Sequence, residues 1–139
     1  MKYFLDTSFI LALVLDSDSN HNEAASLAES VLNEECFINN NVLNEVLTLT
    51  GRKLNIDSAK EIYYNLIDSF ELLNEYDILN YNSENFKIFE KYVGIDSNKT
   101  KLSFTDSSII LTMKEFNIYS LVSFDKEFKR VKGIHQLGV

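Results

Sequence analysis

The chain has 139 residues, with 13 Lys and Arg against 21 Asp and Glu, so its formal net charge is −8. Hydrophobic residues make up 45% of it, as in ordinary globular domains, which excludes a disordered acidic tail. A single cysteine, Cys36, excludes a disulfide framework and a cysteine-cluster metal site, and we expect it to be a buried thiol. The longest apolar run, Phe9 to Leu15, is too short to cross a bilayer. We therefore expect one domain over residues 1–139, cytoplasmic and without membrane contact, and net charge alone argues against a nucleic-acid partner.

Short apolar segments alternate with helical patterns along the chain. In chain order, the first half predicts a strand over Lys2 to Leu5, helices over Phe9 to Leu15 and Asn20 to Asn33, a strand over Cys36 to Ile38, and helices over Asn39 to Lys53 and Asp57 to Ser69, the last capped by Asp57. The second half predicts a strand over Phe70 to Leu73, helices over Ser83 to Val93 and Phe104 to Phe116, a strand over Ser120 to Phe124, a short helix over Lys126 to Val131 and a strand over Ile134 to Leu137. Because the strands lack polar alternation and helices separate them, we predict a three-layer α/β/α fold with a central parallel sheet.

Four acidic residues lie near the ends of these strands. Asp6 follows the first strand and Asp125 the fourth, while Asp106 lies in the first turn of the helix leading into the fourth. Glu45 lies at the edge of the apolar face of the helix that follows the second strand. Each acid also has a structural interpretation, as a helix cap, as part of a capping box that begins at Ser103, or in a surface ion pair. Ligands bind beyond the carboxyl ends of parallel strands, so we expect the four acids to share one crevice.

A cluster of four carboxylates is unstable by itself. Two such charges 4 Å apart repel by about 4 kcal/mol at an effective dielectric constant near 20, so the cluster must take up protons or a cation. Oxygen ligands suit Mg²⁺ or Mn²⁺. We predict Asp6, Asp106 and Asp125 as metal ligands, and Glu45 as a group that positions or deprotonates water, or as a further ligand. Phosphodiester hydrolysis is the reaction that suits these four catalytic residues.

Basic residues follow two of the acids in sequence. Arg52 and Lys53 end the helix that carries the glutamate, and Lys126, Lys129 and Arg130 follow the last aspartate. They are candidates for contacts with a phosphate backbone, with solvated helix ends as the alternative. The aromatic side chains are mostly explained by the core, which leaves as stacking candidates Tyr63, Tyr64, Tyr76 and Tyr81.

Four segments carry a resemblance to a known family. These are Phe4-Leu5-Asp6-Thr7-Ser8, Asn44-Glu45-Val46, Leu102-Ser103-Phe104-Thr105-Asp106 and Val122-Ser123-Phe124-Asp125. In order and spacing they resemble the signature stretches of the PIN domain, a family of metal-dependent ribonucleases, along essentially the whole chain. The resemblance implies a five-stranded parallel sheet of order 3-2-1-4-5. It also implies that the four acids match the family's acids, with polar supporting hydroxyls at Thr7, Ser8 and Ser123.

The resemblance further implies an endoribonuclease that leaves 5′-phosphate and 3′-hydroxyl ends. Many small members are VapC-type toxins, usually homodimers restrained by a cognate antitoxin, so we expect RNA as substrate and an apolar groove for an antitoxin among the early helices. Alternatives are an RNA-processing nuclease outside a toxin-antitoxin pair and a catalytically weak interaction module. Phosphoryl transfer through an aspartyl intermediate is disfavoured, because Ser8 stands where a second acid would be needed.

Overall fold

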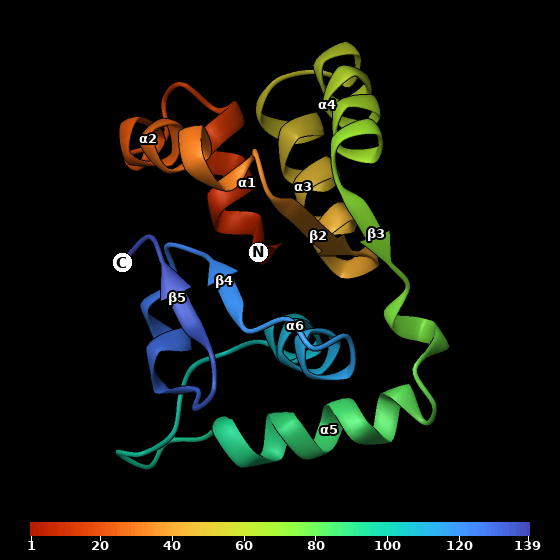
Figure 1. Cartoon of the computed structure of the whole chain (residues 1–139), viewed down its shortest axis with the longest axis vertical. Coiled ribbons are helices and arrows are strands. Elements are labelled where there is room, and N and C mark those ends of the chain that lie inside the picture. Colours follow the sequence, from red (N-terminus) through yellow and green to blue (C-terminus); the bar gives the residue numbers. More distant parts are fainter.

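The computed structural model describes residues 1–139 and is built on one five-stranded sheet (Figure 1). The strands are β1 (Lys2–Leu5), β2 (Glu35–Asn39), β3 (Glu71–Leu73), β4 (Ser120–Val122) and β5 (His135–Leu137). Their order across the sheet is β3-β2-β1-β4-β5, and every neighbouring pair is parallel. The predicted parallel sheet and its strand order are therefore confirmed.

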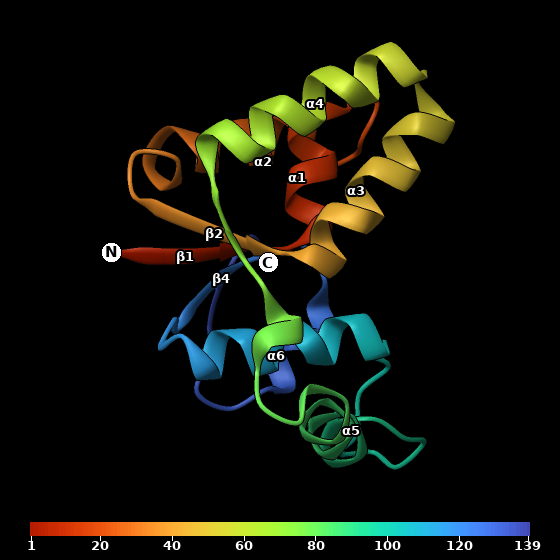
Figure 2. The ribbon, with the colours of Figure 1, turned by 90° about the vertical axis from the view of Figure 1, so that its right-hand side faces the viewer.

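Helices cover both faces of the sheet, as Figure 2 shows. One face carries α1 (Thr7–Val14), α2 (His21–Val31), α3 (Asn40–Lys53) and α4 (Ile56–Ser69). The other carries α5 (Tyr81–Tyr92) and α6 (Phe104–Glu115), with α6 nearer the sheet. Two short 3₁₀ helices, η1 (Glu75–Asp77) and η2 (Lys126–Arg130), follow β3 and β4. The three-layer prediction is confirmed. None of these helices has the length and apolar character needed to cross a membrane.

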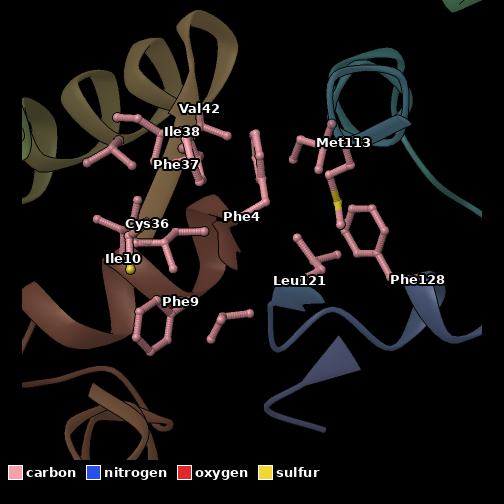
Figure 3. Close-up of a cluster of buried hydrophobic side chains, with 14 of the residues drawn as sticks. Phe4, Phe9, Ile10, Cys36, Phe37, Ile38, Val42, Met113, Leu121 and Phe128 are labelled. Carbon is pink, nitrogen blue, oxygen red and sulfur yellow. The ribbon is translucent and has the colours of Figure 1, made fainter. Parts of the chain in front are cut away.

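A single cluster of 26 buried apolar residues joins the layers. Phe4 and Leu5 of β1 are both fully buried although they point to opposite faces, because the central strand is covered on both sides. Figure 3 shows Met113 and Phe128 packed beside Leu121 on the α6 side of the sheet. The buried central strands therefore hold in fixed positions the residues that follow their carboxyl ends.

Three local predictions needed correction. The cap of α4 is Asn55 rather than Asp57, since its side chain accepts a hydrogen bond from the Ser58 N–H at 2.7 Å and the helix begins one residue earlier. The helix expected over Lys126 to Val131 is the 3₁₀ segment η2. The strand expected over Ser120 to Phe124 ends at Val122, because the two residues after it hydrogen-bond to the segment that follows β1.

Candidate active site

The four predicted acids lie around the carboxyl edge of the sheet and act on one another electrostatically. Asp6 directly follows β1, Asp125 follows β4, Asp106 is in the first turn of α6, and Glu45 is on α3. Burial raises the pKa of Asp6, and the charge of Asp106 raises it further. The pKa of Glu45 is raised by burial and then by the charges of Asp106 and Asp6. Burial raises the pKa of Asp106 too, with a contribution from Asp125. The charges of Asp6, Asp106 and Asp125 thus lie near enough to shift the pKa of a neighbouring acid of the group.

Asp6 is the buried centre of this group. Its backbone precedes α1, but its side chain caps no helix; instead Oδ2 accepts hydrogen bonds from Ser123 Oγ at 2.6 Å and Ser8 Oγ at 2.9 Å. The two hydroxyl oxygens are 3.2 Å apart. Desolvation outweighs these bonds and raises the pKa of Asp6 from 3.8 to about 6. At neutral pH this carboxyl is therefore mostly ionised, and a cation beside it would stabilise the ionised form further.

The loop after β4 holds Asp125 beside this centre. The Asp125 N–H donates to Ser123 Oγ at 3.0 Å, and Asp125 Oδ1 accepts from the Glu127 N–H at 2.9 Å, which caps η2. Gln136 supports the loop from β5, since its Nε2 donates to the carbonyl oxygens of Ser123 and Asp125 at 3.0 and 2.8 Å. Sequence reasoning missed Gln136, because nothing local in the sequence connects it with a loop 11 to 13 residues earlier.

Asp106 takes part in the capping box of α6. Its N–H donates to Ser103 Oγ at 3.0 Å, and its Oδ2 accepts from the Ser103 N–H at 2.9 Å. Burial raises its pKa against the opposing effect of these bonds. The capping interpretation from sequence is thus correct for Asp106, and for Asp125 as well. A carboxylate has two oxygens, so each aspartate keeps one that these bonds do not use.

Glu45 is the half-buried acid of the group. It lies beside the fully buried Val46 on α3 and lines a hollow of about 300 Å³ together with Asn44, Thr48 and Leu49. Burial and two negative neighbours raise its pKa from 4.5 to about 7. Because that value lies close to neutrality and the hollow is open to water, Glu45 can exchange a proton under physiological conditions.

The residues present suit a hard divalent cation in chemical type. All four acids offer oxygen ligands, and the buried Thr7 Oγ1 next to Asp6 has no hydrogen-bond partner. Thr7 is the one predicted supporting hydroxyl that bonds to no acid. In the present side-chain positions, no three His, Cys, Asp or Glu residues lie close enough together to hold a metal ion. The donor set therefore fits Mg²⁺ or Mn²⁺, whereas the present positions do not enclose one.

The predicted basic residues differ in what they contact. Arg52 and Lys53 are exposed at the end of α3, and Lys126 and Lys129 are exposed on η2. Arg130 is exposed as well, but its Nη1 donates to the carbonyl oxygens of residues 97 and 99, at 3.2 and 2.6 Å. Arg130 therefore holds η2 against the loop before α6. The exposed side chains of the other four basic residues are better placed to contact a substrate.

Comparison with known proteins agrees with this geometry. The PIN domain family model matches residues 3–134, and the chain belongs to the PIN domain family. It is 38% identical over 119 residues to Ribonuclease VapC2 of Methanocaldococcus jannaschii, a match that covers 78% of this chain and 77% of that protein. The family resemblance predicted from four short segments is confirmed.

Solved structures share the fold. Mycobacterium tuberculosis VapC20, a toxin that cleaves the sarcin-ricin loop, superposes with a TM-score of 0.78 at 20% identity, covering 95% of this chain and 96% of that one. VapBC2 of Rickettsia felis, bound to a DNA fragment from its promoter, gives a TM-score of 0.65 at 17% identity, covering 99% and 98%. At these identities the likeness establishes the architecture.

Proposed function

We propose that this protein is a divalent-metal-dependent endoribonuclease and the toxin of a VapBC-type toxin-antitoxin pair. The observation that carries the proposal is the group of four mutually interacting acids at the carboxyl edge of a PIN-family sheet. Membership of the family, together with a ribonuclease relative at 38% identity, supports RNA as the substrate. The expected products carry 5′-phosphate and 3′-hydroxyl ends, as the family resemblance implies.

The roles of the acids follow from their surroundings. Asp6, Asp106 and Asp125 would hold Mg²⁺ or Mn²⁺, which when bound offsets negative charge on the phosphodiester and lowers the pKa of a water. Glu45, with a pKa of about 7, can accept the proton that an attacking water loses. Ser8 and Ser123 hold the carboxylate of Asp6 in one orientation. The chain thus supplies ligands, a base and the groups that fix one of the ligands.

Binding of an RNA backbone requires local positive charge on this protein, because its net charge of −8 repels RNA on average. We assign this role to Arg52 and Lys53 beyond Glu45 on α3, and to Lys126 and Lys129 next to Asp125. Arg130 would contribute mainly by holding η2 in place. Lys126 follows Asp125 directly, and Arg52 lies in the last turn of the helix that carries Glu45, which supports a cationic rim around the site.

A protein partner is the second half of the proposal. The solved structures that share this fold include VapBC complexes, such as that of Rickettsia felis. Several large apolar side chains of α4 are exposed, with Ile56 at 77% and Tyr64 at 54%. Such residues support a cognate antitoxin that covers this part of the early helices. A homodimer is proposed on the family resemblance.

The test is cleavage of a labelled RNA pool with and without Mn²⁺. Asp106→Asn is the diagnostic variant, because an amide oxygen can still accept the Ser103 N–H while the charge is lost. Asp68→Asn, on the exposed face of α4, is the matched control. We expect Mn²⁺-dependent cleavage by the wild type and the control, and at least about 100-fold less by Asp106→Asn. Cleavage without metal refutes the metal dependence, equal cleavage by Asp106→Asn refutes the assigned site, and no cleavage by the wild type refutes the nuclease assignment. Growth arrest on expression, relieved by a neighbouring gene, tests the toxin role.

A further inference from the structure

A fully buried glutamate from η1 caps the helix that carries Glu45. Glu75 has no exposed surface and forms no ion pair. Its Oε1 accepts hydrogen bonds from the backbone N–H and the side-chain Nδ2 of Asn40, at 2.9 and 2.8 Å. Its Oε2 accepts from the Asn41 N–H at 2.9 Å. These are the first two N–H groups of α3, which have no partner within the helix. Glu75 thus binds the positive end of α3 with both oxygens.

Glu75 adds a second cap, from another element of the fold, to a helix that is already capped. The helix has an N-cap of its own, since Asn39 Oδ1 accepts from the Val42 N–H at 3.0 Å. Burying a carboxylate costs several kcal/mol of solvation, so a buried charge is weak grounds for inferring a gain in stability. What a second cap from another element does provide is a fixed position for the first turn of α3 relative to the end of β3.

That first turn is also joined to the helix that carries Asp106. Asn41 Nδ2 donates to Ser108 Oγ at 3.0 Å and to the Tyr81 hydroxyl at 3.0 Å. The Tyr76 hydroxyl donates to Asn41 Oδ1 at 2.8 Å, so the whole side-chain amide is held. Asn39 Nδ2 adds bonds to α6, to the hydroxyl oxygens of residues 108 and 112, at 3.4 and 3.2 Å. The bridge lies close to both acids, because Glu45 is one turn beyond Asn41 on α3 and Asp106 is two residues before Ser108 on α6.

We propose that Glu75 is a positioning residue that sets the separation of Glu45 from Asp106. It does so by clamping the first turn of α3, whose Asn41 side chain then fixes α3 against α6 through Ser108. Capture of a divalent cation and deprotonation of water beside it depend on that separation, because Asp106, a proposed ligand, and Glu45, the proposed base, come from different elements of the fold. The inference rests on the proposed metal-dependent nuclease function, and it adds a residue that contacts neither the metal nor the RNA.

The test compares Glu75→Gln with Glu71→Gln, an exposed glutamate on β3 that forms no side-chain hydrogen bond or ion pair. Gln preserves the shape of Glu75, but it replaces one accepting oxygen with a donor that faces an N–H. Mn²⁺ affinity is measured by calorimetry, and kcat and KM on a labelled RNA. For Glu75→Gln we expect Mn²⁺ affinity about 10-fold weaker and kcat about 10- to 100-fold lower, with KM within about twofold. Glu71→Gln should match the wild type.

A further pair of variants separates positioning from a general loss of stability. Val31→Ala opens a cavity at a fully buried site on α2, outside the two helices that the bridge joins, and lowers the melting temperature. Ser108→Ala removes the bonds from Asn41 and Asn39 to Ser108, while the Glu75 contacts and the 3.2 Å bond from Asn39 to Thr112 stay in place. Positioning predicts that Ser108→Ala reproduces the losses of Glu75→Gln, and that Val31→Ala retains full Mn²⁺ affinity when assayed well below its melting temperature.

Three outcomes overturn the inference, and they distinguish its own failure from failure of the proposed function. If Val31→Ala loses Mn²⁺ affinity and kcat as much as Glu75→Gln, or if Glu75→Gln behaves like the wild type, Glu75 has no positioning role and the nuclease function stands. If the wild type neither binds Mn²⁺ nor cleaves RNA, the proposed function fails and the inference fails with it.

Discussion

Removing the hydroxyl of Ser123 should move the pH dependence of the site. Ser123 Oγ donates the 2.6 Å hydrogen bond to Asp6 Oδ2, and among the hydrogen bonds that lower the pKa of Asp6 it has the largest effect. Ser123 is fully buried, so bulk water does not replace the hydrogen bond that its hydroxyl makes to Asp6. In Ser123→Ala, the ionised form of Asp6 therefore loses stabilisation while the desolvation remains.

The size of the effect follows from the bond and from the starting pKa. A hydrogen bond to a charged group contributes about 1.5 kcal/mol or more, and one pH unit of pKa corresponds to about 1.4 kcal/mol. The pKa of Asp6, about 6 in the wild type, should therefore rise to about 7. At pH 6 the ionised fraction falls from about one half to about one tenth, whereas at pH 8 it stays above about nine tenths.

The assay is kcat/KM for a labelled RNA between pH 5.5 and 8.5 at a fixed, subsaturating Mn²⁺ concentration, a range of about three pH units centred on the pKa values of the site. The ratio of variant to wild type removes the contribution of Glu45, which both proteins share. We expect Ser123→Ala to be about fivefold less active at pH 6 and nearly unchanged at pH 8. Ser8→Ala, which removes the longer 2.9 Å bond, should show a smaller change in the same direction. A loss that is equal at all pH values would refute the reasoning, because it would mean that Ser123 acts only by holding the Asp125 loop.

Three further predictions concern stability. The pKa values of Asp6 and Glu45 are raised above their unfolded values, so the stability that these groups contribute is present below about pH 4 and is lost as the pH rises through about 6 and 7. In EDTA, the melting temperature measured by calorimetry should therefore fall between about pH 5 and 8, and Mn²⁺ should reverse the fall. A melting temperature that rises over this range would contradict the pKa shifts. Asp6→Asn should abolish RNA cleavage but raise the melting temperature at about pH 8 in EDTA by several degrees. The reason is that the raised pKa of Asp6 reflects up to about 3 kcal/mol of unfavourable burial of its charge. A melting temperature below that of the wild type would count against this burial cost. Gly138→Ala should lower the free energy of unfolding, measured by urea titration, by about 1–3 kcal/mol, because φ is +112° and a Cβ would lie 2.6 Å from the Ser123 carbonyl oxygen. Gly133→Ala should lower it less, because φ is +86° there but no atom lies within 4 Å of the added Cβ. Equal losses in the two variants would show that the close approach at Gly138 is unimportant.

The sequence predicted the fold and the region of the site for one physical reason. Parallel strands direct their carboxyl ends to the same edge, so an acid after β1 and another after β4 must meet once the strands are placed side by side. Glu45 was predicted from helical periodicity, which placed it at the boundary of an apolar face, and its half-buried position agrees. Local patterns are sufficient where the periodicity of one element decides what a side chain faces.

What could not be predicted depends on contacts between distant residues. Glu75 meets the first turn of α3 from 34 and 35 residues away, and Gln136 reaches the loop after β4 from the neighbouring strand. Arg130 gave a signal typical of nucleic-acid binding, yet it bonds to backbone carbonyls of a loop 31 and 33 residues earlier. For Asp106, capping and a site role were opposed at the sequence level, but its two oxygens allow both.

The pairing of the central strand β1 determines when the site can form during synthesis of the chain. β1 pairs with β2 on one side and with β4 on the other, and the Asp6 N–H itself donates to the carbonyl oxygen of Val122. Asp6 is made well before Ser123 and Asp125, which complete its surroundings, because Ser123 lies 117 residues later in the chain. Fragments that stop short of β4 therefore lack the site, and no activity is expected from a nascent chain until that strand has joined the sheet. A ribonuclease built in this way cannot cut the message from which it is being translated until β4 has been made and has joined β1.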